Sequence, residues 1–142
     1  MRCLIDTNIL ISAALFPESV PMKAFVQAVS PPHSAVVCDY SMDEMRRVFN
    51  RKFPHRIADF ERFVSTMALA VKIVAAPPPE ESVPNEEDIR DLNDRPIFRA
   101  AVAAEVDAIL TGDRDFLESG IASPKMITAA DFCQMNHSDY DE

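Results

Sequence analysis

Short apolar runs alternate along the chain with longer segments in which apolar positions recur every three to four residues. The short runs carry many Val, Ile and Ala residues and are too brief for helices, which is typical of buried strands. The predicted strands are 2–5, 34–38, 71–75 and 107–111, with 125–128 as a candidate fifth.

The longer segments have helical periodicity, and prolines mark several of their limits. Pro54 stops one segment, because proline does not fit a helix interior, and Pro96 suits the first turn of another. The stretch 77–84, PPPEESVP, is predicted to be a stiff acidic connector of polyproline II type. The predicted helices are 8–16, 21–29, 40–52, 56–70 and 96–105, with a short one at 113–118.

Strands separated by helices indicate an α/β fold in which both faces of the sheet are covered. We therefore predict a three-layer α/β/α domain around a central, mostly parallel sheet of four to five strands. Residues 1–132 form this single domain, and residues 133–142 are expected to be a polar C-terminal tail, of which the last seven residues, NHSDYDE, are expected to fray.

The charge balance is acidic, with 23 acidic and 14 basic residues and a formal net charge of -9. This argues against a general nucleic-acid-coating protein, which needs a basic face, but leaves room for a local basic stripe. An acidic pocket that meets phosphate through metal ions also remains open.

The three cysteines are widely spaced and form no C-x-x-C pair, so a disulfide framework or a zinc site is not expected. No leader-like segment opens the chain, and no apolar run approaches the ~18 residues of a membrane helix. We expect a cytoplasmic protein without a membrane partner.

Four carboxylates stand where the predicted strands and helices meet. Asp6 and Asp113 directly follow predicted strands, Glu44 lies in the first turns after another, and Asp94 precedes the helix led by Pro96. In a parallel sheet the carboxyl ends of the strands share one edge, so these side chains are expected to converge. Gathered carboxylates repel one another, and a divalent cation such as Mg²⁺ or Mn²⁺ relieves that repulsion.

Each of these acids also has a structural explanation. Asp6 and Asp113 are good helix N-caps, and Glu44 fits a capping box with Ser41. Asp94 alone is an ordinary signal for a turn before a helix. The metal site is favoured because four unrelated caps have no reason to fall at one edge of the sheet.

Four stretches resemble the PIN-domain ribonucleases. The opening LIDTNILISAALF resembles the start of that family, and DYSMDEMRRVFNRKF resembles its acid-bearing helix followed by basic residues. NDRPIFRAAVAAEVDAILTGDRDFL resembles the family's closing half, and ITAADF resembles its final segment. The resemblance is nearest to the VapC-like toxins of toxin–antitoxin pairs. It implies an endoribonuclease that depends on Mg²⁺ or Mn²⁺, an RNA substrate, an antitoxin partner and a homodimer.

The resemblance also assigns roles to residues. It implies that Asp6, Glu44, Asp94 and Asp113 are catalytic, with Asp6, Asp94 and Asp113 as the main metal ligands. It implies supporting roles for Asn8, Thr111 and Asp115, although Asp115 also fits an exposed acid in a short helix. Family members often place glycine after the helix that ends near AAVAAEV, whereas this chain has Glu105 and Val106, so a different helix ending with some strain is expected.

Basic residues cluster after Glu44. Arg46, Arg47 and Arg51 are candidates for gripping RNA phosphates, and the alternative is a solvated helix face with cations near a C-terminus. The same window also contains Lys52, Arg56 and Arg62.

Two further functions compete with the nuclease. A phosphoacceptor receiver domain needs an acceptor Asp after the third strand, and VKIVAAPPP offers none. A non-catalytic PIN-like domain that binds nucleic acid or protein is disfavoured by the intact acidic set.

Overall fold

The computed structural model describes residues 1–140. Five strands form one sheet in the order β3-β2-β1-β4-β5, and every neighbouring pair is parallel. The strands are β1 (Arg2–Ile5), β2 (Ser34–Cys38), β3 (Lys72–Val74), β4 (Ala108–Leu110) and β5 (Lys125–Ile127). The prediction of a parallel α/β sheet is confirmed, including the candidate fifth strand.

Seven α-helices occur in the described residues: α1 (Thr7–Leu15), α2 (Val20–Ala28), α3 (Asp39–Lys52), α4 (Ile57–Ala70), α5 (Arg95–Ala103), α6 (Arg114–Leu117) and α7 (Ala129–Tyr140). Each predicted helix has a counterpart whose limits differ by one or two residues. The described residues also contain four 3₁₀ turns: η1 (Pro54–Arg56), η2 (Pro79–Glu81), η3 (Glu86–Asp88) and η4 (Leu92–Asp94).

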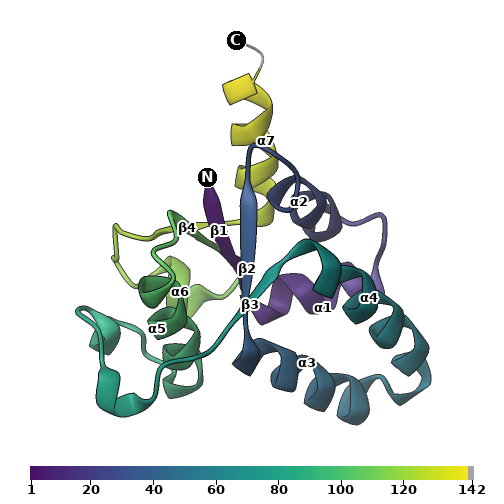
Figure 1. Ribbon diagram of the computed structural model, residues 1–142, viewed down its shortest axis with the longest axis horizontal. Coiled ribbons are helices and arrows are strands. Elements are labelled where there is room, and N and C mark those ends of the chain that lie inside the picture. The colour runs from purple at the N-terminus through teal and green to yellow at the C-terminus, as the bar shows by residue number, and fades with distance from the viewer. Residues whose placement is uncertain (141–142) are drawn as a thin grey trace.

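The sheet separates two apolar cores, and Figure 1 shows the helices that lie on its two sides. Successive side chains of a strand point to opposite faces, so Cys3 and Ile5 of β1 join one core while Leu4 joins the other. Helices α1 to α4 and α7 contribute to the first core, and α5 and α6 to the second. The three-layer α/β/α prediction is therefore confirmed.

Helices α1 and α2 meet at a sharp corner. The Ser19 hydroxyl accepts a hydrogen bond from the Met22 N–H at 3.3 Å and caps α2. No single helix of the described residues is long and apolar enough to cross a membrane; α1 and α2 would suffice only as a pair, and they are bent by 115°.

The C-terminal segment is helical over most of its length. α7 continues to Tyr140, and residues 141–142 lie outside the described part, so the fraying of NHSDYDE stays a prediction. Buried Ala129 and Phe132 anchor the first turn of α7 in the core, and helix propagation carries the following polar residues along. The domain boundary at residue 132 stays a prediction.

The connector 77–84 is also more structured than predicted. It contains the turn η2, and the unpredicted turns η3 and η4 follow it. Buried Arg99 of α5 holds this region: its Nε donates to the Pro77 carbonyl at 2.9 Å, and its Nη1 pairs with Glu86 Oε2 at 3.0 Å. Arg99 of α5 thus fixes the chain segment that leads to Asp94.

The end of α5 keeps the usual left-handed geometry without glycine. Glu105 has φ 54°, its N–H donates to the Val102 carbonyl at 3.0 Å, and the Val106 N–H donates to Ala101 at 3.2 Å. These two bonds are those of a Schellman ending. The expected change of helix ending is wrong, whereas the expected strain is present in the positive φ of a non-glycine residue.

Candidate metal centre

The topology brings the ends of three adjacent strands together. β1 lies between β2 and β4, so the segments that follow these strands leave the sheet at the same edge. The Asp6 N–H donates to the Leu110 carbonyl at 2.9 Å, which continues the pairing of β1 with β4 as far as the site. Asp113 follows β4, and Glu44 lies on α3 after β2.

The Asp6 carboxylate is held by a hydrogen bond on each oxygen. Its Oδ1 accepts from the Thr7 N–H at 2.8 Å, and its Oδ2 accepts from the Thr111 hydroxyl at 2.7 Å. Thr111 Oγ1 in turn accepts from the Asp113 N–H at 3.0 Å. The fully buried Thr111 therefore links Asp6 to Asp113, and Asp6 both caps α1 and faces the site.

Asp94 has an oxygen with no hydrogen-bond partner. The residue is only 8% exposed, and its Oδ2 is buried without a partner among the described residues. It stands at the start of α5 but its side chain does not cap the helix. A buried carboxylate oxygen costs free energy unless something compensates it, so Asp94 is not explained as a cap.

Burial and neighbouring negative charges both raise the pKa values of Asp94 and Asp6. Burial, the nearby Asp113 carboxyl and the charges of Asp6 and Asp91 together raise the pKa of Asp94 to about 8, with burial as the largest cause. The pKa of Asp6 is raised to about 6: burial is the largest cause, hydrogen bonds from Thr111 and Thr7 lower it, and the charges of Asp113 and Glu44 raise it. The pocket concentrates negative charge that a cation would neutralise.

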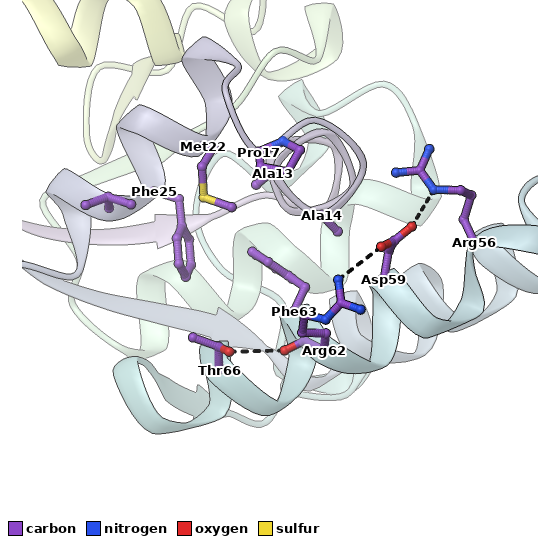
Figure 2. A pocket seen from close by; sticks show the side chains of 11 residues that line it. Ala13, Ala14, Pro17, Met22, Phe25, Arg56, Asp59, Arg62, Phe63 and Thr66 are labelled. Carbon is purple, nitrogen blue, oxygen red and sulfur yellow. Dashed lines mark hydrogen bonds and ion pairs between the residues drawn. The ribbon is translucent and has the colours of Figure 1, made fainter.

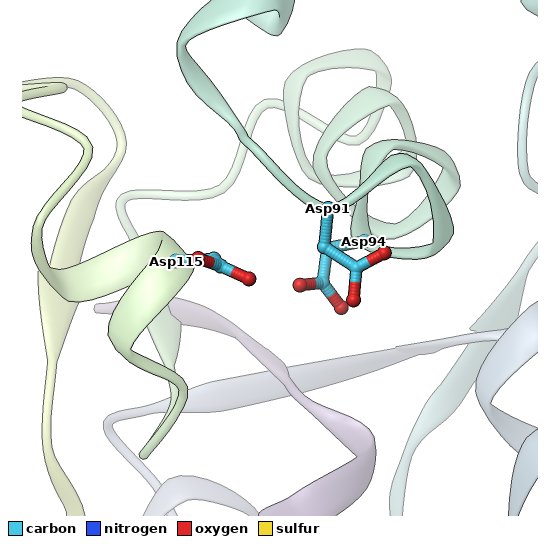
Figure 3. A group of neighbouring side chains, drawn as sticks. All are labelled: Asp91, Asp94 and Asp115. Carbon is cyan, nitrogen blue, oxygen red and sulfur yellow. The ribbon is translucent and has the colours of Figure 1, made fainter.

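Three aspartates form one close group. One carboxylate oxygen each of Asp91, Asp94 and Asp115 lies within 4.8 Å of the others, and Figure 3 shows the three side chains facing a common space. Only Asp94 belongs to the predicted metal set of Asp6, Asp94 and Asp113. The difference has a physical reason: the oxygens of Asp6 accept from Thr7 and Thr111, which holds that carboxylate at the head of α1.

Sequence reasoning missed Asp91. It follows no strand, and its Oδ1 accepts from the Asn93 N–H at 2.9 Å as the cap of η4, a turn that was not predicted. The spacing of Asp91 and Asp94, three residues apart in an acidic loop, was the available signal, since one turn then places both on the same side.

The capping box of Ser41 with Glu44 does not form. α3 begins at Asp39, so Ser41 lies inside the helix, where its fully buried hydroxyl accepts from the Thr7 hydroxyl at 2.8 Å. Glu44 is half-buried and close enough to Asp6 for its charge to raise that pKa. Asn8 is exposed in the first turn of α1, and its side chain makes no hydrogen bond within residues 1–140.

The three candidate phosphate-binding arginines are exposed on α3. Arg46, Arg47 and Arg51 form no ion pair with any described residue, and Arg47 lies over the Tyr40 ring with its guanidinium carbon 5.7 Å from the centroid. Unpaired guanidinium groups remain available to an anionic ligand. Their role in binding RNA stays a prediction.

Arg56 and Arg62, further along the basic window, have structural partners. Both pair with Asp59 beside a pocket of about 310 Å³ that α1, α2 and α4 line, as Figure 2 shows. Arg56 Nη2 also donates to the Leu15 carbonyl at 2.9 Å. None of the four candidate catalytic acids lines this pocket, which is mainly apolar.

The acidic residues fit a hard divalent cation. All the candidate donors are carboxylate oxygens, which are the ligands that Mg²⁺ and Mn²⁺ prefer. The partnerless Oδ2 of Asp94 supplies a donor that no protein group uses. No zinc-type set of cysteines or histidines accompanies these acids in the described chain.

Fold and site together define a parallel α/β domain with an acidic pocket at the carboxyl edge of its sheet. Residues 2–115 match the family model of the PIN domain. The chain therefore belongs to the PIN-domain family, and the receiver-domain alternative is wrong.

Solved structures share this fold at low sequence identity. VapBC2 from Rickettsia felis, bound to a DNA fragment from its promoter, superimposes with a TM-score of 0.64 at 12% identity, covering 90% of this chain and 98% of that one. VapC20 from Mycobacterium tuberculosis, a sarcin-ricin loop cleaving toxin, gives 0.59 at 13% identity, covering 84% and 96%. No curated protein sequence matches the chain.

Proposed function

We propose that the protein is a metal-dependent endoribonuclease and the toxin component of a toxin–antitoxin pair. The observation that carries the proposal is the buried Asp94, whose Oδ2 has no partner in a pocket shared with other carboxylates. Membership of the PIN-domain family and the folds of VapC20 and VapBC2 support the same reading.

Asp6, Asp94 and Asp113 are the proposed metal ligands, with Mg²⁺ or Mn²⁺ as the ion. The bound ion would supply Lewis-acid neutralisation of phosphate and activation of a water molecule. Thr111 holds Asp6 and the Asp113 backbone in place through its hydroxyl. Glu44, on the neighbouring helix, is proposed to complete the pocket and orient the attacking water.

Asn8 and Asp115 are proposed supporting residues. Asp115 joins the close cluster with Asp91 and Asp94, so it is within reach of the ion or of a water bound to it. Asn8 is exposed at the head of α1, next to Thr7, and would act on substrate or water rather than on the buried acids.

The RNA strand is proposed to run along α3. Arg46, Arg47 and Arg51 are exposed on the helix that carries Glu44, and they would neutralise phosphates that flank the cleaved bond. Their positive charge offsets locally the net charge of -9. A cytoplasmic location, an antitoxin partner and a homodimer belong to the same proposal and rest on the family resemblance.

The test is cleavage of a mixed pool of structured and single-stranded RNAs, with Mg²⁺, with Mn²⁺ and with chelator. Wild type is compared with Asp94→Asn and with Asp88→Asn, a matched change of an exposed acid in η3, the turn before η4. Cleavage by wild type and Asp88→Asn with metal, and its loss with chelator or in Asp94→Asn, is expected.

Two outcomes contradict the proposal. Metal binding without cleavage of any RNA would favour the non-catalytic alternative, in which the domain only binds nucleic acid or protein. Equal cleavage by Asp94→Asn and wild type would remove the buried carboxylate from the mechanism.

A further inference from the structure

Arg90 brings a positive charge into direct contact with the acidic pocket. Its Nη2 lies 2.9 Å from Asp115 Oδ1 and 3.3 Å from Glu118 Oε2. Asp115 is one of the three close carboxylates of Figure 3. Because Arg90 directly precedes Asp91 in the chain, one loop supplies both a carboxylate and a cation to the same place.

A divalent cation and this guanidinium have the same target. An ion bound at Asp94 is within reach of the carboxylate oxygens of Asp91 and Asp115, and Arg90 already occupies Oδ1 of Asp115. The partnerless Oδ2 of buried Asp94 independently indicates that this space is built for a ligand. Two positive groups at one carboxylate repel each other, so binding of the ion weakens the pair with Arg90.

The Arg90 side chain is able to leave. It is 67% exposed, and its other partner, Glu118, is 56% exposed, so the guanidinium can turn into solvent without losing a packed position. Asp115 is 26% exposed and is fixed at the start of α6, where its N–H donates to Asp113 Oδ1 at 2.9 Å. The Asp115 backbone is therefore held in place when the guanidinium leaves.

We propose that Arg90 is an internal counter-cation of the acidic pocket, which competes with the divalent ion for Asp115 and so lowers the metal affinity of the site. Arg90 acts through Asp115 and is a positioning residue rather than a catalytic one. The proposal rests on the metal centre of the proposed function, but not on which substrate is cut.

Calorimetric titration with MnCl₂ at fixed ionic strength tests this directly. Because an exposed ion pair is weak, Arg90→Gln is expected to tighten Mn²⁺ binding by about two- to fivefold. Arg90→Lys retains a cation near Asp115 and is expected to restore most of the wild-type affinity. Arg114→Gln is the matched control: Arg114 is 86% exposed and lies 3.9 Å from Glu118 without an ion pair to Asp115, yet the variant loses the same charge.

A double variant separates the pair from a general charge effect. In an Asp115→Asn background, Arg90→Gln is expected to leave the Mn²⁺ affinity unchanged, since the shared carboxylate is gone. The proposal is overturned if Arg90→Gln and Arg114→Gln tighten Mn²⁺ binding equally. It is also overturned if the single variant Arg90→Gln binds Mn²⁺ with unchanged or lower affinity. If wild type binds no Mn²⁺ at all, the metal centre of the proposed function falls as well.

Discussion

Replacing Asp6 by Asn tests the electrostatics of the pocket without any assumption about the substrate. Burial raises the pKa of Asp6 from 3.8 to about 6. The folded state then holds the proton more tightly than the unfolded state, so the free energy of unfolding falls as pH rises through this interval. At about 1.4 kcal/mol per pKa unit, the ionised carboxylate costs about 3 kcal/mol at pH 8 when no metal is bound.

The substitution removes this cost but disturbs one hydrogen bond. An Asn carbonyl can still accept from the Thr7 N–H, whereas its amide faces the Thr111 hydroxyl, which now donates to Asp6 Oδ2. Losing that donation costs about 1 kcal/mol. We therefore expect Asp6→Asn to be more stable than wild type by about 2 kcal/mol at pH 8 and less stable by up to about 1 kcal/mol near pH 4.

The assay is urea unfolding in chelator at pH 4 and pH 8, followed by far-ultraviolet circular dichroism because the chain has no tryptophan. Asp43→Asn, an exposed acid on α3, serves as the control and is expected to change stability by less than about 0.5 kcal/mol at both pH values. If Asp6→Asn is destabilised equally at pH 4 and pH 8, the carboxylate carries no charge penalty and the reasoning is refuted.

Three further changes have defined outcomes. Arg99→Leu leaves the 12% exposed Glu86 carboxylate without its partner and is expected to lower the free energy of unfolding by about 3 kcal/mol, as measured by urea unfolding; no loss would show the pair to be dispensable. Glu105→Gly relieves a left-handed backbone at an exposed position and is expected to add about 0.5 to 1 kcal/mol by the same measurement, whereas destabilisation would contradict the strain. At a concentration 100 times its Kd, Mn²⁺ is expected to stabilise wild type by about 2.7 kcal/mol in thermal unfolding and to have little effect on Asp94→Asn; equal shifts would place the ion elsewhere.

The elements and the edge that carries the acids were predictable from the sequence. A parallel sheet places the residues after its strands at one edge, so Asp6 and Asp113 were expected to meet, and Thr111 links them. Helix limits followed from prolines and from apolar periodicity, which are local signals. The positions of Asp6 and Asp113, which follow strand ends, were therefore predictable from the sequence.

Residue positions that depend on loop geometry were not predictable from the sequence. Asp91 enters the cluster through η4, a three-residue turn with no periodic signature. Arg90 reaches Asp115 across 25 positions of sequence (115 − 90), and nothing local marks the pair. Glu105 keeps a glycine-like conformation because two backbone hydrogen bonds and the packing of α5 impose it, which no residue preference indicates.

The central position of β1 also governs when the pocket is assembled during synthesis. Asp6 is synthesised 105 positions before Thr111, whose hydroxyl holds its carboxylate. Until β4 is made, β1 has only β2 as a hydrogen-bonded neighbour. Closing so long a loop has an entropic cost, which the pairing of β1 with β4 must offset. Asp94, Asp113 and Asp115 join at about the same stage, so a nascent chain holds no complete pocket. Any chemistry of this site therefore requires a chain that has been synthesised at least as far as α6.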